Sequence, residues 1–226
     1  MPEAFITDVD GTLTDAGRRL SLDAVSEIRR LIDTGIPVVF ASGNTLCFLD
    51  GLSHMIGTDG KVIAENGGVY RNGFLEKKHV EGNRALCLEA YQRVVAEFKP
   101  KGDELRLFSY DYRYSDLAFS RDVEADAVSK LLQDMPLNVI DTGFAIHLQT
   151  PGISKGAAFS KLAALMGLET SDFLAAGDSI NDISMLERAG TAVAPQNACA
   201  EVKALGCEIT AKPYGEGIAD AIRKYF

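Results

Sequence analysis

The chain has 226 residues, of which 46% are hydrophobic and 24% charged, and its formal net charge is −9. This length allows one large domain or two smaller ones, each with a buried core. The acidic balance argues against nonspecific binding to nucleic acid or to an anionic membrane surface, because both attract basic patches. The first apolar run is far too short to span a bilayer and follows no basic segment, so we expect a cytoplasmic protein with no membrane partner.

The cysteines give no sign of metal or disulfide chemistry. The four of them lie far apart and form no CxxC pair: Cys47, Cys87, Cys199 and Cys207. Free buried thiols therefore explain them better than a zinc site or a disulfide framework.

Two carboxylates follow the first apolar run, which covers residues 4–6. Asp8 and Asp10 would share one face of a strand that ran straight through them. Gly11 instead predicts a sharp turn, which leaves Asp8 at the end of the strand and moves Asp10 onto a loop. One carboxylate can then attack while its neighbour handles a proton, with a hard cation between them. The alternative is an ordinary Asp-Gly turn with both acids solvated.

The next segments alternate between helix and strand periodicity. Ser21 is a candidate N-cap for an amphipathic helix that Gly35 should end. Residues 37–41 then predict a buried strand, Ser42-Gly43-Asn44 the loop that leaves it, and residues 62–64 a third strand. This order favours βαβ units around a parallel sheet.

Between residues 69 and 149 the pattern changes to short runs flanked by hairpin signals, Asn72-Gly73 and Thr142-Gly143. An αββαββ stretch of this kind predicts an antiparallel α+β layer inserted into the parallel domain, with boundaries near residues 80 and 152. The expected helices are 84–98 and 123–133, and the expected strands are 105–109, 117–120, 138–141 and 144–149. Four side chains of the insert are candidates for contacting a substrate carboxylate, although a surface or core role is the default for each: Arg106, Arg113, Arg121 and His147.

The parallel pattern resumes with a helix over 157–166 and strands at 173–176 and 191–194. Asp178, Asn181 and Asp182 stand where the first of these strands gives way to a helix, and their spacing brings them together if the helix begins promptly. The carboxyl ends of parallel strands line a common crevice, so these acids should meet Asp8 and Asp10 there. Carboxylates that converge without a counter-charge favour a divalent cation, and oxygen ligands favour Mg²⁺. The alternative is a simple helix cap.

Two segments supply hydrogen-bond donors and positive charge, the groups that bind an anion. The hydroxyl and backbone amides of Ser42-Gly43-Asn44 can hold phosphate oxygens, and Lys155, which precedes the helix over 157–166, provides a compact positive charge. Taken singly, each is better explained by an ordinary turn or by a solvated surface lysine, and only their order and spacing favour a phosphate site.

In their order and spacing these motifs resemble the haloacid dehalogenase superfamily of aspartate-nucleophile phosphatases. Asp8-Val-Asp-Gly-Thr12 is similar to its first motif, Ser42-Gly-Asn44 to its second, Lys155-Gly156 to its third, and the segment from Gly177 to Asp182 to its fourth. The resemblance implies an α/β fold with a Rossmann-like, doubly wound parallel sheet as its core, formed by residues 1–79 and 153–226. Residues 80–152 would form the inserted α+β cap domain. This cap and the segment Glu65-Asn-Gly-Gly68 resemble the type IIB subgroup.

The resemblance also implies roles for these residues. Asp8 would attack phosphorus to give an aspartyl phosphate, while Asp10 would protonate the leaving alkoxide and later deprotonate water. Mg²⁺ would be held by Asp8, the backbone carbonyl of Asp10, Asp178 and Asp182. Ser42, Gly43, Asn44 and Lys155 would bind the phosphate, and Asn181 would orient Lys155 or the phosphate.

Within the subgroup, the short cap and the ending Pro213-Tyr-Gly-Glu-Gly217 are most similar to archaeal phosphoglycolate phosphatases, which makes 2-phosphoglycolate the expected substrate. A sugar-phosphate phosphatase and a phosphomutase of the same fold are the alternatives. A non-catalytic receiver phosphorylated on Asp8 would need neither Asp10 nor a cap. The partner is expected to be a small phosphomonoester and not nucleic acid, and a homodimer stays open.

Overall fold

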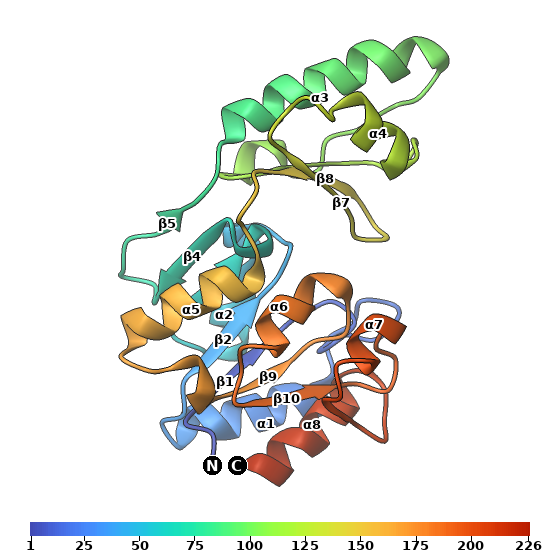
Figure 1. Ribbon diagram of the computed structural model, residues 1–226. Coiled ribbons are helices and arrows are strands. Elements are labelled where there is room, and N and C mark those ends of the chain that lie inside the picture. The colour runs from blue at the N-terminus through green and yellow to red at the C-terminus, as the bar shows by residue number, and fades with distance from the viewer. The chain divides into compact units, whose positions relative to one another are not determined.

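The computed structural model describes residues 1–226 and divides into two compact units. The first combines residues 1–79 with 154–226, and the second covers residues 80–153. Figure 1 shows the elements of both units. No helix has both the length and the apolar character needed to cross a membrane.

The first unit is built on an eight-stranded sheet with the order β11-β10-β9-β1-β2-β3-β4-β5. The six strands from β11 to β3 run parallel, and β4 pairs antiparallel with β3. The strands are β1 (Ala4–Thr7), β2 (Val38–Ala41), β3 (Lys61–Ala64), β4 (Val69–Asn72), β5 (His79–Val80), β9 (Phe173–Ala176), β10 (Thr191–Ala194) and β11 (Glu208–Ile209). The helices are α1 (Leu22–Asp33), α2 (Leu46–Ile56), α5 (Lys155–Met166), α6 (Ile183–Leu186), α7 (Ala200–Lys203) and α8 (Tyr214–Tyr225).

Helices cover both faces of this sheet. On one face α1, α2 and α8 pack against strand residues that include Phe5 and Phe40. On the other, α5, α6 and α7 pack against residues that include Ile6 and Val39. Neighbouring residues of β1 and β2 therefore belong to opposite cores, because successive side chains of a strand point to opposite faces. This arrangement confirms the predicted α/β class with a doubly wound, mostly parallel sheet.

The caps of the core helices follow the sequence signals. The Ser21 hydroxyl accepts a hydrogen bond from the Ala24 amide at the start of α1, and the Ser154 hydroxyl accepts one from the Ala157 amide at the start of α5. Each satisfies an amide that the first helical turn leaves without a partner. α5 begins two residues earlier than predicted, which makes Lys155 its first residue.

The second unit has its own apolar core around a three-stranded antiparallel sheet with the order β6-β8-β7. Its elements are α3 (Arg84–Phe98), β6 (Leu117–Phe119), α4 (Ala125–Leu131), β7 (Asn138–Asp141) and β8 (Ile146–Gln149). α3 has the predicted bounds, whereas α4 is shorter than the predicted helix over 123–133.

The strand predicted over 105–109 is wrong. Only an isolated bridge joins Leu107 to Phe119. Leu105 and Ser109 have φ angles of 52° and 53°, and a left-handed residue at each end interrupts the extended conformation that a strand requires.

Candidate active site

Three neighbouring strands deliver the predicted residues to one edge of the sheet. β1 lies between β9 and β2, so the chain order reverses at β1. Asp8 directly follows β1 and Ser42 directly follows β2, while Asp178 stands two residues after β9. Ligands of open α/β sheets bind at such a switch point, outside the carboxyl ends of the strands. The fold therefore places these three side chains where such sheets bind ligands.

Asp8, Asp178 and Asp182 form an acidic cluster in which one ligand atom from each lies within 4.8 Å of the others. Oδ2 of Asp8 is buried and has no hydrogen-bond partner. Burial raises the pKa of Asp8 well above its usual range, against the lowering effect of Lys155 and with a further rise from the two other acids. Burial and the nearby Asp182 raise the pKa of Asp178 to about 6. The unpartnered oxygen and this repulsion fit a hard divalent cation bound among the three carboxylates.

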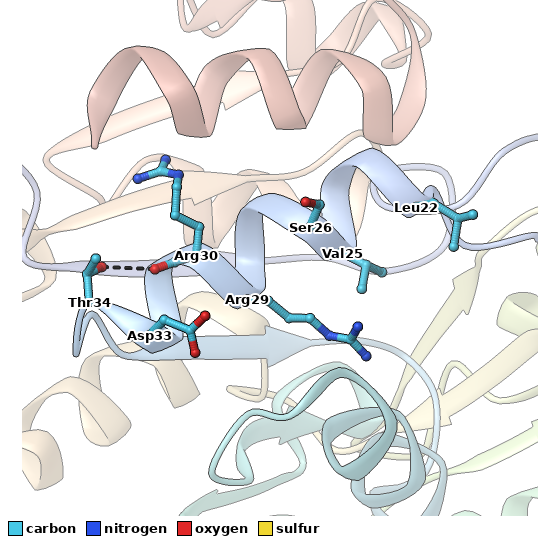
Figure 2. A pocket seen from close by; sticks show the side chains of 7 residues that line it. All are labelled: Leu22, Val25, Ser26, Arg29, Arg30, Asp33 and Thr34. Atoms are coloured by element: carbon cyan, nitrogen blue, oxygen red, sulfur yellow. Dashed lines mark hydrogen bonds between the residues drawn. The ribbon is translucent and has the colours of Figure 1, made fainter.

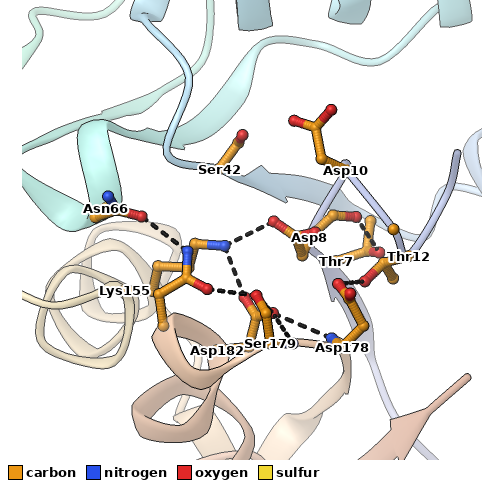
Figure 3. Close-up of polar contacts among 12 residues, drawn as sticks. Thr7, Asp8, Asp10, Thr12, Ser42, Asn66, Lys155, Asp178, Ser179 and Asp182 are labelled. Atoms are coloured by element: carbon orange, nitrogen blue, oxygen red, sulfur yellow. Dashed lines mark hydrogen bonds and ion pairs between the residues drawn. The ribbon is translucent and has the colours of Figure 1, made fainter. Parts of the chain in front are cut away.

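Lys155 is fully buried, and its ammonium joins two members of the cluster. Nζ donates to Oδ1 of Asp8 and to Oδ1 of Asp182, both at 2.6 Å (Figure 3). Burial would lower the pKa of Lys155, but the carboxylates of Asp182 and Asp8 outweigh it and hold that pKa above its usual value. The ammonium is therefore a fixed positive charge beside Asp8, and not the solvated surface lysine of the alternative interpretation.

Asp182 already has several partners. Its Oδ1 accepts from Lys155, and its Oδ2 accepts from the amides of Asp178 and Ser179 at 3.1 and 3.0 Å. The Ser179 hydroxyl also donates to Oδ2, at 3.1 Å. This carboxylate therefore closes the loop after β9 and orients Lys155 at the same time.

The loop after β1 is a tight turn that Gly11 makes possible. Gly11 has φ = 84°, and a Cβ there would lie 2.5 Å from Oδ2 of Asp178. The Thr12 hydroxyl donates to Oδ1 of the same Asp178 at 2.8 Å. The predicted turn at Gly11 is present, and it brings the loop of Asp10 against the loop of Asp178.

Asp10 and the Ser42–Asn44 loop are in direct contact. Nδ2 of Asn44 donates to Oδ2 of Asp10 at 2.6 Å. The Ser42 hydroxyl accepts hydrogen bonds from the Asn44 amide and from Nδ2 of Asn44, both at 3.1 Å. Asn44 therefore orients the Asp10 carboxyl, a contact that the phosphate-binding interpretation of this loop did not include.

Asn66 is a site residue whose hydrogen-bond partners the sequence did not predict. It lies in the 3₁₀ turn η1 (Glu65–Gly67), is buried, and has φ = 54°. Its amide donates to the Ser42 carbonyl at 3.1 Å, and its Oδ1 accepts from Nδ2 of Asn181 at 2.9 Å. Asn181, which was expected to orient Lys155 or the phosphate, contacts Asn66. The partners of the Lys155 ammonium are Asp8 and Asp182.

The next residue, Gly67, has no side chain, which lets η1 pack against Ser154 at the start of α5. A Cβ on Gly67 would overlap the Ser154 carbonyl. The motif Glu65-Asn66-Gly67 therefore touches the loops after β2 and β9 and the start of α5. The signal available in the sequence was the Asn-Gly pair, which is typical of left-handed turns.

The four candidate residues of the second unit differ in their surroundings. Arg113 and His147 are buried, and both contact the buried Asp116, at 2.6 and 2.9 Å. Burial alone would raise the pKa of Asp116, but Arg113 and His147 hold it below its ordinary value of 3.8. Arg106 and Arg121 are exposed, and Arg121 donates to Asp141 at 2.8 Å. The core role that was the default for His147 is the one observed.

A pocket on α1 has no part in this chemistry. It is lined by Leu22, Val25, Ser26, Arg29, Arg30, Asp33 and Thr34 (Figure 2). Arg29 donates to the carbonyls of Met55 and Ile56, both at 3.0 Å, at the end of α2. The pocket contains none of the predicted site residues, and its Arg29 links two helices.

Comparison with known proteins identifies the family. The model of the haloacid dehalogenase-like hydrolases matches residues 5–138 and 125–222. The chain therefore belongs to this family of hydrolases, as its motifs predict.

Relatives of similar length carry a more specific name. The phosphoglycolate phosphatase of Methanoculleus marisnigri is 49% identical over 228 residues, which cover 100% of this chain and 97% of the relative. The phosphoglycolate phosphatase of Methanothermobacter thermautotrophicus is 40% identical over 98% of both chains. The prediction of a phosphatase agrees with both names.

Solved structures share the fold over its full length. A protein of Thermoplasma acidophilum superimposes with a TM-score of 0.88 at 27% identity, covering 99% of this chain and 98% of the other. A haloacid dehalogenase-like hydrolase of Bacteroides thetaiotaomicron gives a TM-score of 0.79 at 22% identity over 100% of both chains. The second likeness concerns the fold alone.

Proposed function

We propose that this chain is a Mg²⁺-dependent phosphatase that hydrolyses 2-phosphoglycolate to glycolate and phosphate through an aspartyl phosphate on Asp8. The proposal rests on the hydrogen bonding of the Asp8 carboxylate. One oxygen is paired with the buried Lys155 and the other is buried without a partner. A carboxylate that the buried ammonium holds at a strand end is fixed in place, as a nucleophile requires.

The first half of the reaction uses Asp8 and Asp10. A carboxylate oxygen of Asp8 forms a bond to phosphorus as the bond from phosphorus to the glycolate oxygen breaks. Asp10, protonated and oriented by Asn44, donates its proton to that leaving oxygen. Lys155 and the hydroxyl of Ser42 in the Ser42-Gly43-Asn44 loop stabilise the negative charge on the phosphoryl oxygens.

The second half returns the enzyme to its starting state. Asp10, now a carboxylate, takes a proton from water as the water oxygen attacks phosphorus. The bond between phosphorus and the Asp8 oxygen breaks, which releases phosphate and restores the Asp8 carboxylate. Asp10 ends the cycle protonated, so protons and charges balance.

The acidic cluster would hold Mg²⁺ through Asp8, Asp178 and the backbone carbonyl of Asp10. Asp182, whose oxygens already accept four hydrogen bonds, would hold it less directly. When bound, the ion supplies positive charge for Asp8 and for the phosphate. The raised pKa values of Asp8 and Asp178 support this assignment, because they show how unfavourable the cluster is without a cation.

The substrate assignment rests on the relatives. Two relatives that match this chain over at least 97% of their length are named phosphoglycolate phosphatases. Residues 80–152 would act as the cap that reads the carboxylate of the leaving group, with the exposed Arg106 as one candidate contact. A cytoplasmic location and the absence of nucleic-acid and membrane partners stay predictions. A homodimer stays open.

A phosphate-release screen tests the proposal. The purified chain is assayed with Mg²⁺ on 2-phosphoglycolate, sugar phosphates and nucleotides. We expect the highest kcat/KM for 2-phosphoglycolate. A higher value for a sugar phosphate would refute the substrate, and net transfer without phosphate release would indicate a phosphomutase.

A further inference from the structure

Asn197 joins the loop after β1 to the start of the C-terminal helix. It lies between β10 and α7 and is half-buried. Nδ2 donates to the Gly11 carbonyl at 2.9 Å, and Oδ1 accepts from the Tyr214 amide at 2.6 Å. Because a carbonyl only accepts and a backbone N–H only donates, these partners fix both ends of the Asn197 amide group.

The Tyr214 end of this bridge is held by its surroundings. Tyr214 is the first residue of α8 and has φ = 56°, a left-handed conformation that a non-glycine residue adopts only where neighbouring structure imposes it. At the next residue, a Cβ on Gly215 would overlap Ser21 and lie 2.7 Å from the Leu13 carbonyl oxygen. The start of α8 therefore packs tightly against the loop that follows β1.

The same segment also contacts the second acidic loop. The Cys199 amide donates to the backbone carbonyl of Asp178 at 2.8 Å. Residues 197–199 thus hold Gly11, beside Asp10, through a side chain and hold Asp178 through a backbone amide. Two hydrogen bonds from one segment therefore link the two loops that carry the acids.

We propose that Asn197 is a positioning residue that fixes the Gly11 peptide, and through it Asp8 and Asp10, for phosphoryl transfer. The inference rests on the proposed function of the site. Asn197 contacts no reacting group itself. Its contribution comes from geometry, since a displacement of about 1 Å in a reacting group can cost about 100-fold in rate.

Two substitutions separate the halves of the bridge. Asn197→Asp keeps an acceptor for the Tyr214 amide but replaces the donor to Gly11 with an oxygen. Asn197→Leu has a similar size and removes both hydrogen bonds. Gln196→Ala, at the exposed neighbouring position, is the matched control, and each variant is compared with the wild type at equal concentrations of folded protein.

The measurements are kcat and KM for phosphate release, together with hydrogen exchange of the Leu13 and Thr14 amides, which donate to the Val9 carbonyl. We expect Asn197→Asp to lower kcat by about 10- to 100-fold, to change KM by less than about threefold, and to speed the exchange of both amides. Asn197→Leu should lower kcat at least as much, and Gln196→Ala should have the kcat and the exchange rates of the wild type. A purely structural role would lower the melting temperature and leave the kcat of the folded protein unchanged.

Unchanged kcat and unchanged exchange in folded Asn197→Asp would overturn the proposal. A wild type that releases no phosphate from any substrate would refute the proposed function, and in that case the exchange rates alone decide whether Asn197 holds the loop. The two failures are therefore distinguishable.

Discussion

Oδ1 of Asn66 accepts a hydrogen bond from Nδ2 of Asn181 at 2.9 Å, which joins the turn after β3 to the loop after β9. The same Asn66 donates its backbone amide to the Ser42 carbonyl. Asn66 thus contacts two segments that are proposed to bind phosphate, and its φ is 54°. Substitutions can separate the role of its side chain from that of its backbone.

Asn66→Gly removes the carboxamide but suits the left-handed backbone, whereas Asn66→Ala removes the carboxamide and is strained. We expect both to lower kcat/KM by about tenfold, which corresponds to the loss of about one hydrogen bond. Only Asn66→Ala should also lose about 1 kcal/mol of unfolding free energy. Urea unfolding and steady-state assays check this, and equal stability of the two variants would contradict the backbone argument.

Lys155→Met tests the buried positive charge. The substitution leaves Asp8 and Asp182 buried without their shared partner, and we expect a loss of about 3–5 kcal/mol of unfolding free energy in metal-free protein. Adding Asp182→Asn should recover part of the loss, because one uncompensated charge disappears. Urea unfolding in the presence of a chelator measures the free energy of unfolding of both variants. A loss below about 1 kcal/mol for Lys155→Met would contradict the described ion pairs.

Mg²⁺ should stabilise the folded chain through the acidic cluster. Because a ligand that binds only the folded state raises its stability, we expect the wild-type melting temperature to rise with Mg²⁺ concentration and activity to vanish in a chelator. Asp178→Asn should abolish or greatly weaken the thermal response. Glu187→Gln, at an exposed acid outside the cluster, is the control and should respond like the wild type. An undiminished response in Asp178→Asn would exclude the cluster as the metal site.

Asp116 predicts a pH dependence of stability in the second unit. Its pKa is held below 3.8 in the folded chain, so the unfolded state binds the proton more tightly. The stability that this carboxylate contributes is fully present above pH 3.8 and is lost as the pH falls through the lowered folded pKa. Asp116→Asn should be less stable than the wild type at pH 7, because Arg113 loses a buried partner. Its unfolding free energy should fall less than that of the wild type when the pH is lowered. Unfolding free energies at pH 7 and near pH 3 check this, and parallel losses in the two proteins would contradict it.

The regular elements and the identity of the acidic residues could be predicted from the sequence because they depend on local signals. The periodicity of residues 84–98 predicts α3 with its observed bounds, and Ser21 caps α1 as expected. The strand predicted over 105–109 failed because local β propensity does not reveal the left-handed residues at both of its ends.

The contacts within the site depend on folding and were less predictable. Asn66 and Asn181 are 115 residues apart, and Lys155 meets Asp8 across 147 residues. A spacing pattern identifies such residues as polar groups at strand ends, but only the packed sheet determines which of them touch. For the same reason the sequence did not reveal that Asn44 holds Asp10 or that Asn197 holds Gly11.

The proposed mechanism requires that Asp8 becomes phosphorylated during turnover. The most direct measurement is rapid acid quenching of the enzyme during the reaction with 2-phosphoglycolate and Mg²⁺. Borohydride then reduces any acyl phosphate, and mass spectrometry locates the reduced residue. We predict homoserine at position 8 in the wild type, and neither homoserine nor phosphate release in Asp8→Asn. Substantial turnover by folded Asp8→Asn, or an acyl phosphate at another carboxylate, would contradict the assignment of Asp8 as the nucleophile.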